Sequence, residues 1–128
     1  MYQNSPTPLV KTNTVITMPH RFASLPLLLD AGMAALRRKS VALTAYLESL
    51  VQKHVGDELA VITPSDPAQR GCQLSLRLRA GARRGREVFE ALGREGVVCD
   101  WREPDIMRMA PVPLYNSFTD VLQAVSRL

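Results

Sequence analysis

Apolar positions change their spacing several times along the chain, and each spacing predicts a different element. From about Leu27 to His54, five leucines and one methionine recur every three, four or seven residues, at positions 29, 33, 36, 43, 47 and 50. This spacing is typical of one face of an amphipathic helix. Asp30 in the first turn suits the helix dipole, and Gly56 can end the helix. We therefore expect one long helix over residues 27–54.

Strict alternation of apolar and polar residues predicts a half-buried strand. Cys72, Leu74, Leu76 and Leu78 alternate with polar residues over eight positions, which is the clearest strand pattern in the chain. Cys72 is expected to face the core with the leucines, as free cysteines usually do. Three shorter strands are predicted, over residues 59–63, 97–101 and 106–110.

Two further helices are predicted after these strands. One covers residues 81–96, and the last begins at Asn116 or Ser117, where Ser117 and Asp120 form an imperfect capping box. The order is then helix, strand, strand, helix, strand, strand, helix. Such an order predicts an α+β fold, with a mostly antiparallel sheet of about four strands and helices packed on one face.

The N-terminal residues 1–26 are poorly patterned. They contain four prolines, at positions 6, 8, 19 and 26. Residues 14–18 are compatible with a short strand, and the rest is typical of an irregular arm. We therefore divide the chain into an arm over residues 1–26 and one domain over residues 27–128.

Composition narrows the class of protein. Of the 128 residues, 46% are hydrophobic and 22% are charged, so one folded domain with its own core is expected. No apolar run approaches the roughly 20 residues that span a bilayer, and the N-terminus lacks a signal-peptide pattern. Cys72 and Cys99 are too few for a disulfide framework or a four-ligand zinc site. These features predict a cytoplasmic protein that binds no membrane.

The basic residues offer one candidate surface. The formal net charge is +4, and five arginines cluster at positions 77, 79, 83, 84 and 86. Such a cluster can bind phosphates, or it can be a solvated strand face and loop. We favour the solvated surface, because none of the seven aromatic residues is interleaved with the cluster to form a stacking platform. Nucleic acid is therefore not an expected partner.

Other residues with chemical potential are isolated. His20 and His54 have no second ligand at metal-binding spacing. Cys99 lies in an apolar strand without a neighbouring histidine, so it is expected to be inert packing. The chain also lacks a glycine-rich phosphate loop. No catalytic residue and no metal ligand follow from the spacing of these residues.

Arg108 has a more informative position. In the predicted strand, Ile106, Arg108 and Ala110 point to one side, and Met107 and Met109 point to the other. Two apolar neighbours place the guanidinium on a face expected to be buried, where it needs a partner. That partner is either a carboxylate of the same chain or a ligand carboxylate held by the bidentate fork. The proline-rich turn at residues 111–116 would fix this strand end.

Several motifs resemble kynureninase and occur in the same order over roughly residues 28–128. They are AGMAALRRKS and LTAYLE (within 31–48), RGCQLSL (70–76), GVVCDWREPD (96–105) and RMAPVPLYNSF (108–118), the last being the most specific. The resemblance covers about four-fifths of the chain. It implies the C-terminal small domain of a pyridoxal-phosphate (PLP) enzyme of the aspartate-aminotransferase fold type, also called fold type I.

The resemblance also implies an activity and a role for one residue. Kynureninase is a homodimeric hydrolase of tryptophan catabolism that converts L-kynurenine to anthranilate and L-alanine. In the family, the arginine of the RMAPVPLYNSF motif anchors the substrate α-carboxylate, and this role falls to Arg108. The family also needs a lysine that forms a Schiff base with PLP. Lys11, Lys39 and Lys53 match no such motif.

We therefore expect a truncated or split kynureninase. Its small domain would bind L-kynurenine through Arg108 only together with a large PLP domain, and the chain is expected to form a homo-oligomer or to associate with the missing domain. By itself the chain is expected to bind no PLP and to be inactive. The alternative is a non-catalytic module that binds a ligand or another protein after loss of the PLP domain. RNA binding through the sheet is disfavoured because exposed aromatic residues are few.

Overall fold

A computed structural model of the chain describes residues 18–128, with side chains described from Leu25 onward. Lys11 therefore lies outside the described residues. The strand predicted at residues 14–18 also lies outside them, except for Met18. The elements are helices α1 (Met18–Ala31), α2 (Met33–His54), α3 (Ala82–Arg94) and α4 (Phe118–Val125), and strands β1 (Leu59–Val61), β2 (Leu74–Leu78), β3 (Asp100–Arg102) and β4 (Ile106–Met109). Short 3₁₀ turns at Gly56–Glu58 and Pro67–Gln69 lie on either side of β1.

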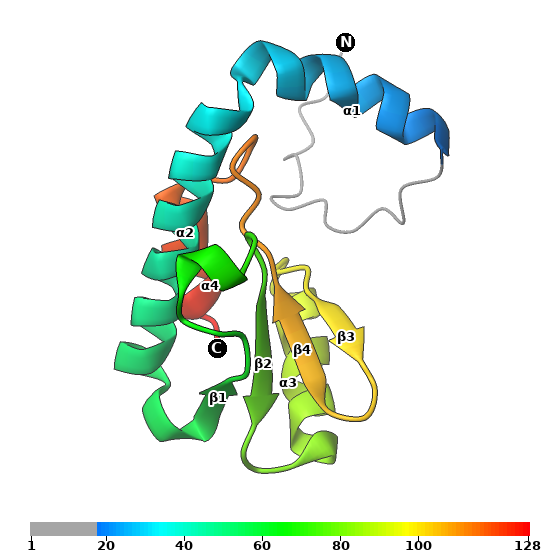
Figure 1. Cartoon of the computed structure of the whole chain (residues 1–128). Helices are drawn as coiled ribbons and strands as arrows, with labels where there is room; N and C mark the ends of the chain where they lie inside the picture. The colour runs from blue at the N-terminus through cyan, green and yellow to red at the C-terminus, as the bar shows by residue number, and fades with distance from the viewer. Residues whose placement is uncertain (1–17) are drawn as a thin grey trace, which may run out of the picture.

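The four strands form one antiparallel sheet in the order β1-β2-β4-β3. β1 pairs with β2, β3 pairs with β4, and β2 joins the two pairs at the centre of the sheet. Helices α2, α3 and α4 pack on the same face, as Figure 1 shows. The predicted α+β fold with an antiparallel sheet and helices on one face is confirmed.

The hydrophobic core lies between this face of the sheet and the helices. Leu43 and Leu47 of α2, Leu74 and Leu76 of β2 and Leu92 of α3 are almost completely buried. Met107, Met109, Val121 and Val125 complete the layer from β4 and α4. Alternation along each strand places every second side chain in this layer and its neighbours on the opposite face.

The long helix differs from its prediction at the N-terminal end. The chain forms two helices instead of one, because Gly32 between them has a φ of 78°. Glycine adopts this left-handed conformation at little steric cost, so it breaks the helix there. α1 begins at Met18, within the region predicted to be irregular, and contains Pro26. The four prolines supported an irregular arm, but Pro26 lies in the interior of α1, where its missing N–H leaves one helical hydrogen bond unformed.

The strands are shorter than predicted, and this changes the place of both cysteines. β2 begins at Leu74, so Cys72 precedes the strand, is half-buried and lies outside the hydrophobic core, contrary to the prediction. The ladder starts where Leu74 pairs with Met109. Cys99 precedes β3 and packs against the core.

The predicted capping of α4 is confirmed: the Ser117 hydroxyl accepts from the Asp120 N–H at 3.2 Å, and Asp120 Oδ2 accepts from the Ser117 N–H at 2.8 Å.

Candidate functional site

The two faces of β4 carry different chemistry. Met107 and Met109 are buried against the helices, while Ile106 and Arg108 are half-buried on the opposite face. The predicted alternation is confirmed, but the arginine lies on the face that no helix within residues 18–128 covers, which we call the open face. The open face also carries Ser75, Arg77, Asp100 and Arg102 of the neighbouring strands, as their register with β4 shows. Ile106 and Ala110, the apolar neighbours on the same side as Arg108, misled the prediction, because both are only half-buried.

Sheet register brings two polar residues to the sides of Arg108. Its partner on β2 is Ser75, and its partner on β3 is Asp100. The Nη2 group of Arg108 donates a hydrogen bond to Asp100 Oδ2 and forms an ion pair with it. A carboxylate of the same chain is therefore one partner of this guanidinium, which was the first of the two alternatives left by the sequence.

Asp100 is shared between two arginines. Its Oδ2 also lies 3.1 Å from Nε of Arg102, in the same strand. The Nε of Arg108 is buried and has no hydrogen-bond partner among the described residues. One carboxylate thus faces two guanidinium groups, and the three side chains carry a formal charge of +1. Such a group is suited to bind a further carboxylate, because a guanidinium offers several donors in a planar fork.

The turn that follows β4 is closed by Asn116. The buried side-chain Oδ1 of Asn116 accepts a hydrogen bond from the Val112 N–H at 2.8 Å, and the Asn116 backbone N–H donates to the Val112 carbonyl at 2.8 Å. Pro111 and Pro113 restrict the backbone within the same turn. These bonds fix the chain just after the strand that carries Arg108, as the proline-rich segment predicted.

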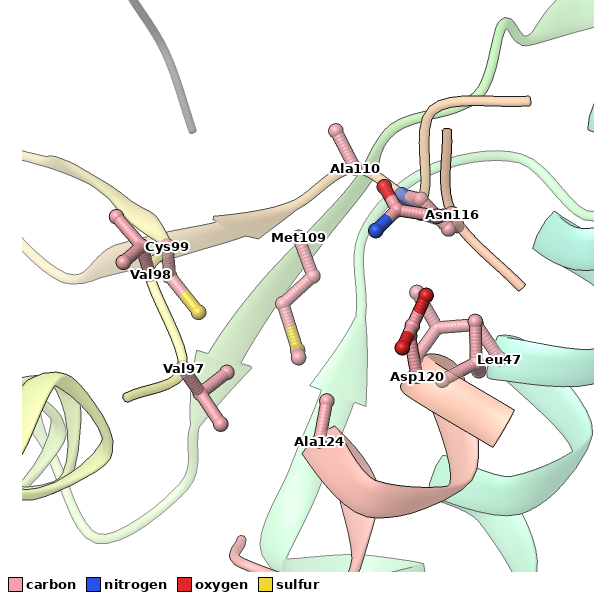
Figure 2. Close-up of a pocket in the computed structure, with 11 residues that line it drawn as sticks. Leu47, Val97, Val98, Cys99, Met109, Ala110, Asn116, Asp120 and Ala124 are labelled. Atoms are coloured by element: carbon pink, nitrogen blue, oxygen red, sulfur yellow. The ribbon is translucent and has the colours of Figure 1, made fainter. Parts of the chain in front are cut away.

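A small apolar pocket of about 50 Å³ lies on the helix side of β4. Figure 2 shows Cys99, Met109 and Ala124 around it, with Asn116 and Asp120 as its polar side chains. Burial raises the pKa of the Cys99 thiol to about 12, so the thiol stays protonated at neutral pH and is a poor nucleophile. Cys99 packs against the core as predicted, its chemical inertness stays a prediction, and Arg108 does not line this pocket.

The arginine cluster is an exposed surface with its own counter-ions. Arg83 and Arg84 pair with Glu87 at 3.3 and 3.1 Å, and Arg86 pairs with Glu90 at 3.0 Å. The guanidinium of Arg86 also lies 5.4 and 5.5 Å from the ring centroids of two aromatic residues, Phe89 and Trp101. Neither neighbour was predicted: Phe89 lies one helical turn after Arg86, a signal that the sequence already carried, whereas Trp101 reaches α3 only through the tertiary fold. The acidic residues at i+3 and i+4 support a solvated helix face.

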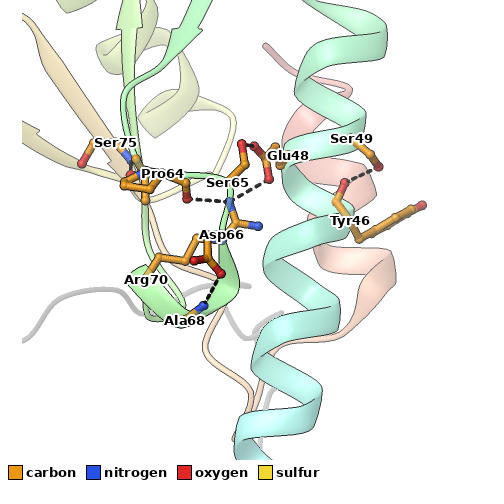
Figure 3. A network of polar contacts seen from close by, with 10 residues as sticks. Tyr46, Glu48, Ser49, Pro64, Ser65, Asp66, Ala68, Arg70 and Ser75 are labelled. Atoms are coloured by element: carbon orange, nitrogen blue, oxygen red, sulfur yellow. Dashed lines mark hydrogen bonds and ion pairs between the residues drawn. The ribbon is translucent and has the colours of Figure 1, made fainter.

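Sequence reasoning missed a buried polar network beside α2 (Figure 3). Arg70, whose side chain is 4% exposed, donates from Nη1 to Glu48 Oε2 at 2.7 Å and to the Pro64 carbonyl at 3.2 Å. The Ser65 hydroxyl donates to Glu48 Oε1 at 2.6 Å. Burial by itself would raise the pKa of Glu48, but the hydrogen bonds from Ser65 and Arg70 outweigh it and lower the pKa below the ordinary glutamate value.

This network ties the loop between β1 and β2 to α2. Arg70 is the first residue of the RGCQLSL motif and directly precedes the segment that leads into β2. Glu48 lies on α2, and no short spacing connects it to Arg70, so the sequence carried no local signal for the pair. The Glu48–Arg70 pair therefore fixes the entrance to the central strand pair and lies apart from the open face.

The described lysines do not fit a covalently bound PLP. Lys39 and Lys53 of α2 are exposed, and neither lines the apolar pocket. A Schiff-base lysine needs a pocket that holds the rest of the cofactor. In the part of the chain with described side chains, no three histidine, cysteine or acidic residues gather as metal ligands. Over those same residues, no helix combines the length and the apolar character that crossing a bilayer requires.

Comparison with known proteins gives consistent matches. The family profile "Kynureninase C-terminal domain" matches residues 36–128. A kynureninase of Xanthomonas campestris pv. campestris (strain B100) is 56% identical over 106 residues, which cover 83% of this chain and 25% of that protein. Kynureninases of Xanthomonas euvesicatoria pv. vesicatoria (strain 85-10) and Stenotrophomonas maltophilia (strain K279a) are 58% and 56% identical over 99 residues, 77% of this chain. The chain spans about a quarter of the length of these relatives.

Proposed function

Because this chain belongs to the kynureninase family, we propose that it supplies the substrate-carboxylate site of a kynureninase, with Arg108 as the binding residue. The family implies PLP in the full-length protein. The lysines described here do not fit that cofactor, so a PLP domain of the kind found in the remaining three-quarters of the relatives would have to supply its site.

One observation carries this proposal: Arg108 lies on the open face with its charge only partly compensated. Its counter-ion Asp100 is shared with Arg102. L-kynurenine has an α-carboxylate, which a guanidinium can hold through two parallel hydrogen bonds. None of the described helices covers this face, so a second domain can approach it and enclose the substrate. The chain's own part in the reaction is to bind and orient this carboxylate.

A chimera tests whether the domain can do this. Residues 36–128 replace the matching segment of the Xanthomonas campestris kynureninase, and hydrolysis of L-kynurenine is measured for the chimera and for the unmodified relative. At 56% identity the domain should fit its new neighbours, so kcat/KM should stay within about tenfold of the relative's value. A folded chimera without activity would contradict the proposal and favour the non-catalytic binding module.

Within this chimera, Arg108→Ala tests the binding residue. Loss of a charged bidentate contact should raise the KM for L-kynurenine by about 30- to 100-fold. Arg108→Lys keeps the charge but loses the planar guanidinium fork, so its KM should lie between those of the unsubstituted chimera and Arg108→Ala. Arg77→Ala is the matched control, because Arg77 lies on the same face and pairs with Asp105 at 2.9 Å. A KM that Arg108→Ala leaves unchanged would refute the role of Arg108.

A further inference from the structure

We infer that Asp100 is a positioning residue for Arg108 and that Arg102 in turn holds Asp100. This inference rests on the proposed function, because it concerns how the same arginine is presented to a carboxylate ligand. The three side chains together, which we call the Arg102–Asp100–Arg108 triad, orient one guanidinium and leave it with unneutralised charge. Asp100 does not touch the reacting atoms and acts through Arg108.

The backbone fixes the place of Asp100 relative to Arg108. β3 and β4 are joined by the three residues 103–105, and the register pairs Asp100 with Arg108 and Arg102 with Ile106. Directly opposite residues in an antiparallel pair have Cβ atoms about 5 Å apart. Asp100 can therefore reach the guanidinium from a fixed strand position and limit its rotamers.

The hydrogen bonds leave part of the Arg108 fork for a ligand. Asp100 accepts from Nη2, and the buried Nε has no partner among the described residues. Arg108 and Asp100 are 25% and 23% exposed, so the pair is reachable from the open face. A ligand carboxylate can approach Nη1 while Asp100 keeps its bond to Nη2. Holding one edge of the group reduces the side-chain entropy that the ligand would otherwise have to remove.

Arg102 determines whether Asp100 favours or opposes the binding of a ligand carboxylate to Arg108. If Asp100 faced Arg108 alone, the pair would be neutral and its carboxylate would repel a ligand carboxylate. Arg102 Nε, 3.1 Å from the same oxygen of Asp100, compensates that charge. The triad then carries a formal charge of +1, which one monoanionic carboxylate neutralises. This charge balance favours a role for Asp100 in positioning Arg108 over a role in which Asp100 competes with the ligand carboxylate.

Asp100→Asn and Arg102→Ala test the triad in the chimera described above. Asp100→Asn should raise the KM for L-kynurenine about tenfold, with kcat unchanged, because Arg108 loses a charged hydrogen bond that orients it. Arg102→Ala should raise KM about two- to fivefold. Arg102 is 62% exposed, so this variant should fold even if Asp100→Asn does not. Asp100→Glu keeps the charge and should recover part of the loss. Arg94→Ala, an exposed arginine at the end of α3, is the control.

A second readout uses the 128-residue chain by itself, outside the chimera and without any cofactor. The Nε–Hε signal of Arg108 in a ¹⁵N–¹H NMR spectrum reports how firmly the guanidinium is held. Asp100→Asn should shift this signal and broaden it or speed its exchange with water, whereas Arg77→Ala should leave it in place. An Arg108 signal that does not respond to Asp100→Asn would show that Asp100 does not hold the guanidinium in solution.

The outcomes separate this inference from the proposed function. If Arg108→Ala leaves KM unchanged, the proposed function fails, and the triad has no ligand to orient. If Arg108→Ala raises KM but Asp100→Asn leaves it unchanged or lowers it, only the positioning role of Asp100 is overturned. A parallel fall in kcat for Asp100→Asn would also overturn it, because a residue that orients only the carboxylate anchor should not affect the chemical step.

Discussion

The two faces of the sheet are built from the same strands but carry opposite kinds of residue. On the helix-covered face, Leu74 and Leu76 are fully buried, and Met107 and Met109 are nearly so. On the open face, Arg108 and Asp100 retain about a quarter of their exposure. Alternation within β4 thus places the proposed binding residue directly beside residues of the core. Changes on the covered face should affect folding, and changes on the open face should affect recognition.

The largest effect that tests this contrast is expected from Leu76→Ala. Leu76 is fully buried in β2 and pairs with Met107. Loss of its side chain should lower the free energy of unfolding by about 3 kcal/mol, through lost burial and the cavity left behind. Ser75→Ala, one residue earlier on the open face, should change it by less than about 0.5 kcal/mol. Urea denaturation of both variants measures the difference, and similar losses would contradict the division between the faces.

A smaller difference in unfolding free energy is expected between two variants that each break one ion pair, one pair buried and the other more exposed. Glu48→Gln breaks the pair with Arg70, whose side chain is 4% exposed, and should cost about 2 kcal/mol of unfolding free energy, because Arg70 keeps a buried charge. Asp105→Asn breaks the open-face pair with Arg77, whose side chain is 49% exposed, and should cost less than about 1 kcal/mol. An equal cost for the two variants would show that burial does not set the strength of these pairs.

The pH dependence of stability gives a second measure of the Glu48–Arg70 pair. The pKa of Glu48 is lowered in the folded chain, so the unfolded chain binds the proton more tightly than the folded one. The stabilisation is therefore present above the ordinary glutamate pKa and is lost as the pH falls through the folded value. The difference in unfolding free energy between wild type and Glu48→Gln should shrink between neutral pH and strongly acidic pH. A constant difference would exclude the ionised pair as its cause.

The smallest of these effects is expected at the helix cap that supports the covered face. Asp120→Ala removes the carboxylate that accepts from the Ser117 N–H and should lower the free energy of unfolding by about 1 kcal/mol. Gln123→Ala, at an exposed position of the same helix, is the control. Thermal unfolding compares the two. Alanine has a higher intrinsic helix propensity than glutamine, so Gln123→Ala should not lower the midpoint. An Asp120→Ala midpoint no lower than that of Gln123→Ala would show that the capping box contributes nothing.

The periodicity of apolar residues was sufficient to predict the helix-covered layer. The leucine spacing of α2, the alternation in β2 and the Ser117–Asp120 cap predicted the α+β architecture, because burial of apolar side chains requires those spacings. The break at Gly32 and the start of α1 at Met18 were not predicted. Glycine is tolerated inside many helices, so its presence does not determine where a helix breaks.

The open face was only partly predictable. Arg108 stood out by its place in an apolar strand and in the RMAPVPLYNSF motif. Asp100 was overlooked, although a signal was present: a three-residue loop at 103–105 places Asp100 opposite Arg108 in a hairpin. The Glu48–Arg70 pair had no such signal, because its residues are 22 positions apart and meet only when the loop packs on α2.

The sequence by itself determined the class of fold, the family resemblance and the arginine that carries the proposed function, because side-chain periodicity and motif order are local properties of the chain. Only the tertiary structure decided which face of the sheet that arginine occupies and which carboxylate it contacts. The choice of face depends on which side the helices cover, and the contact depends on the register of two strands. Both are set by packing between segments that are distant along the chain.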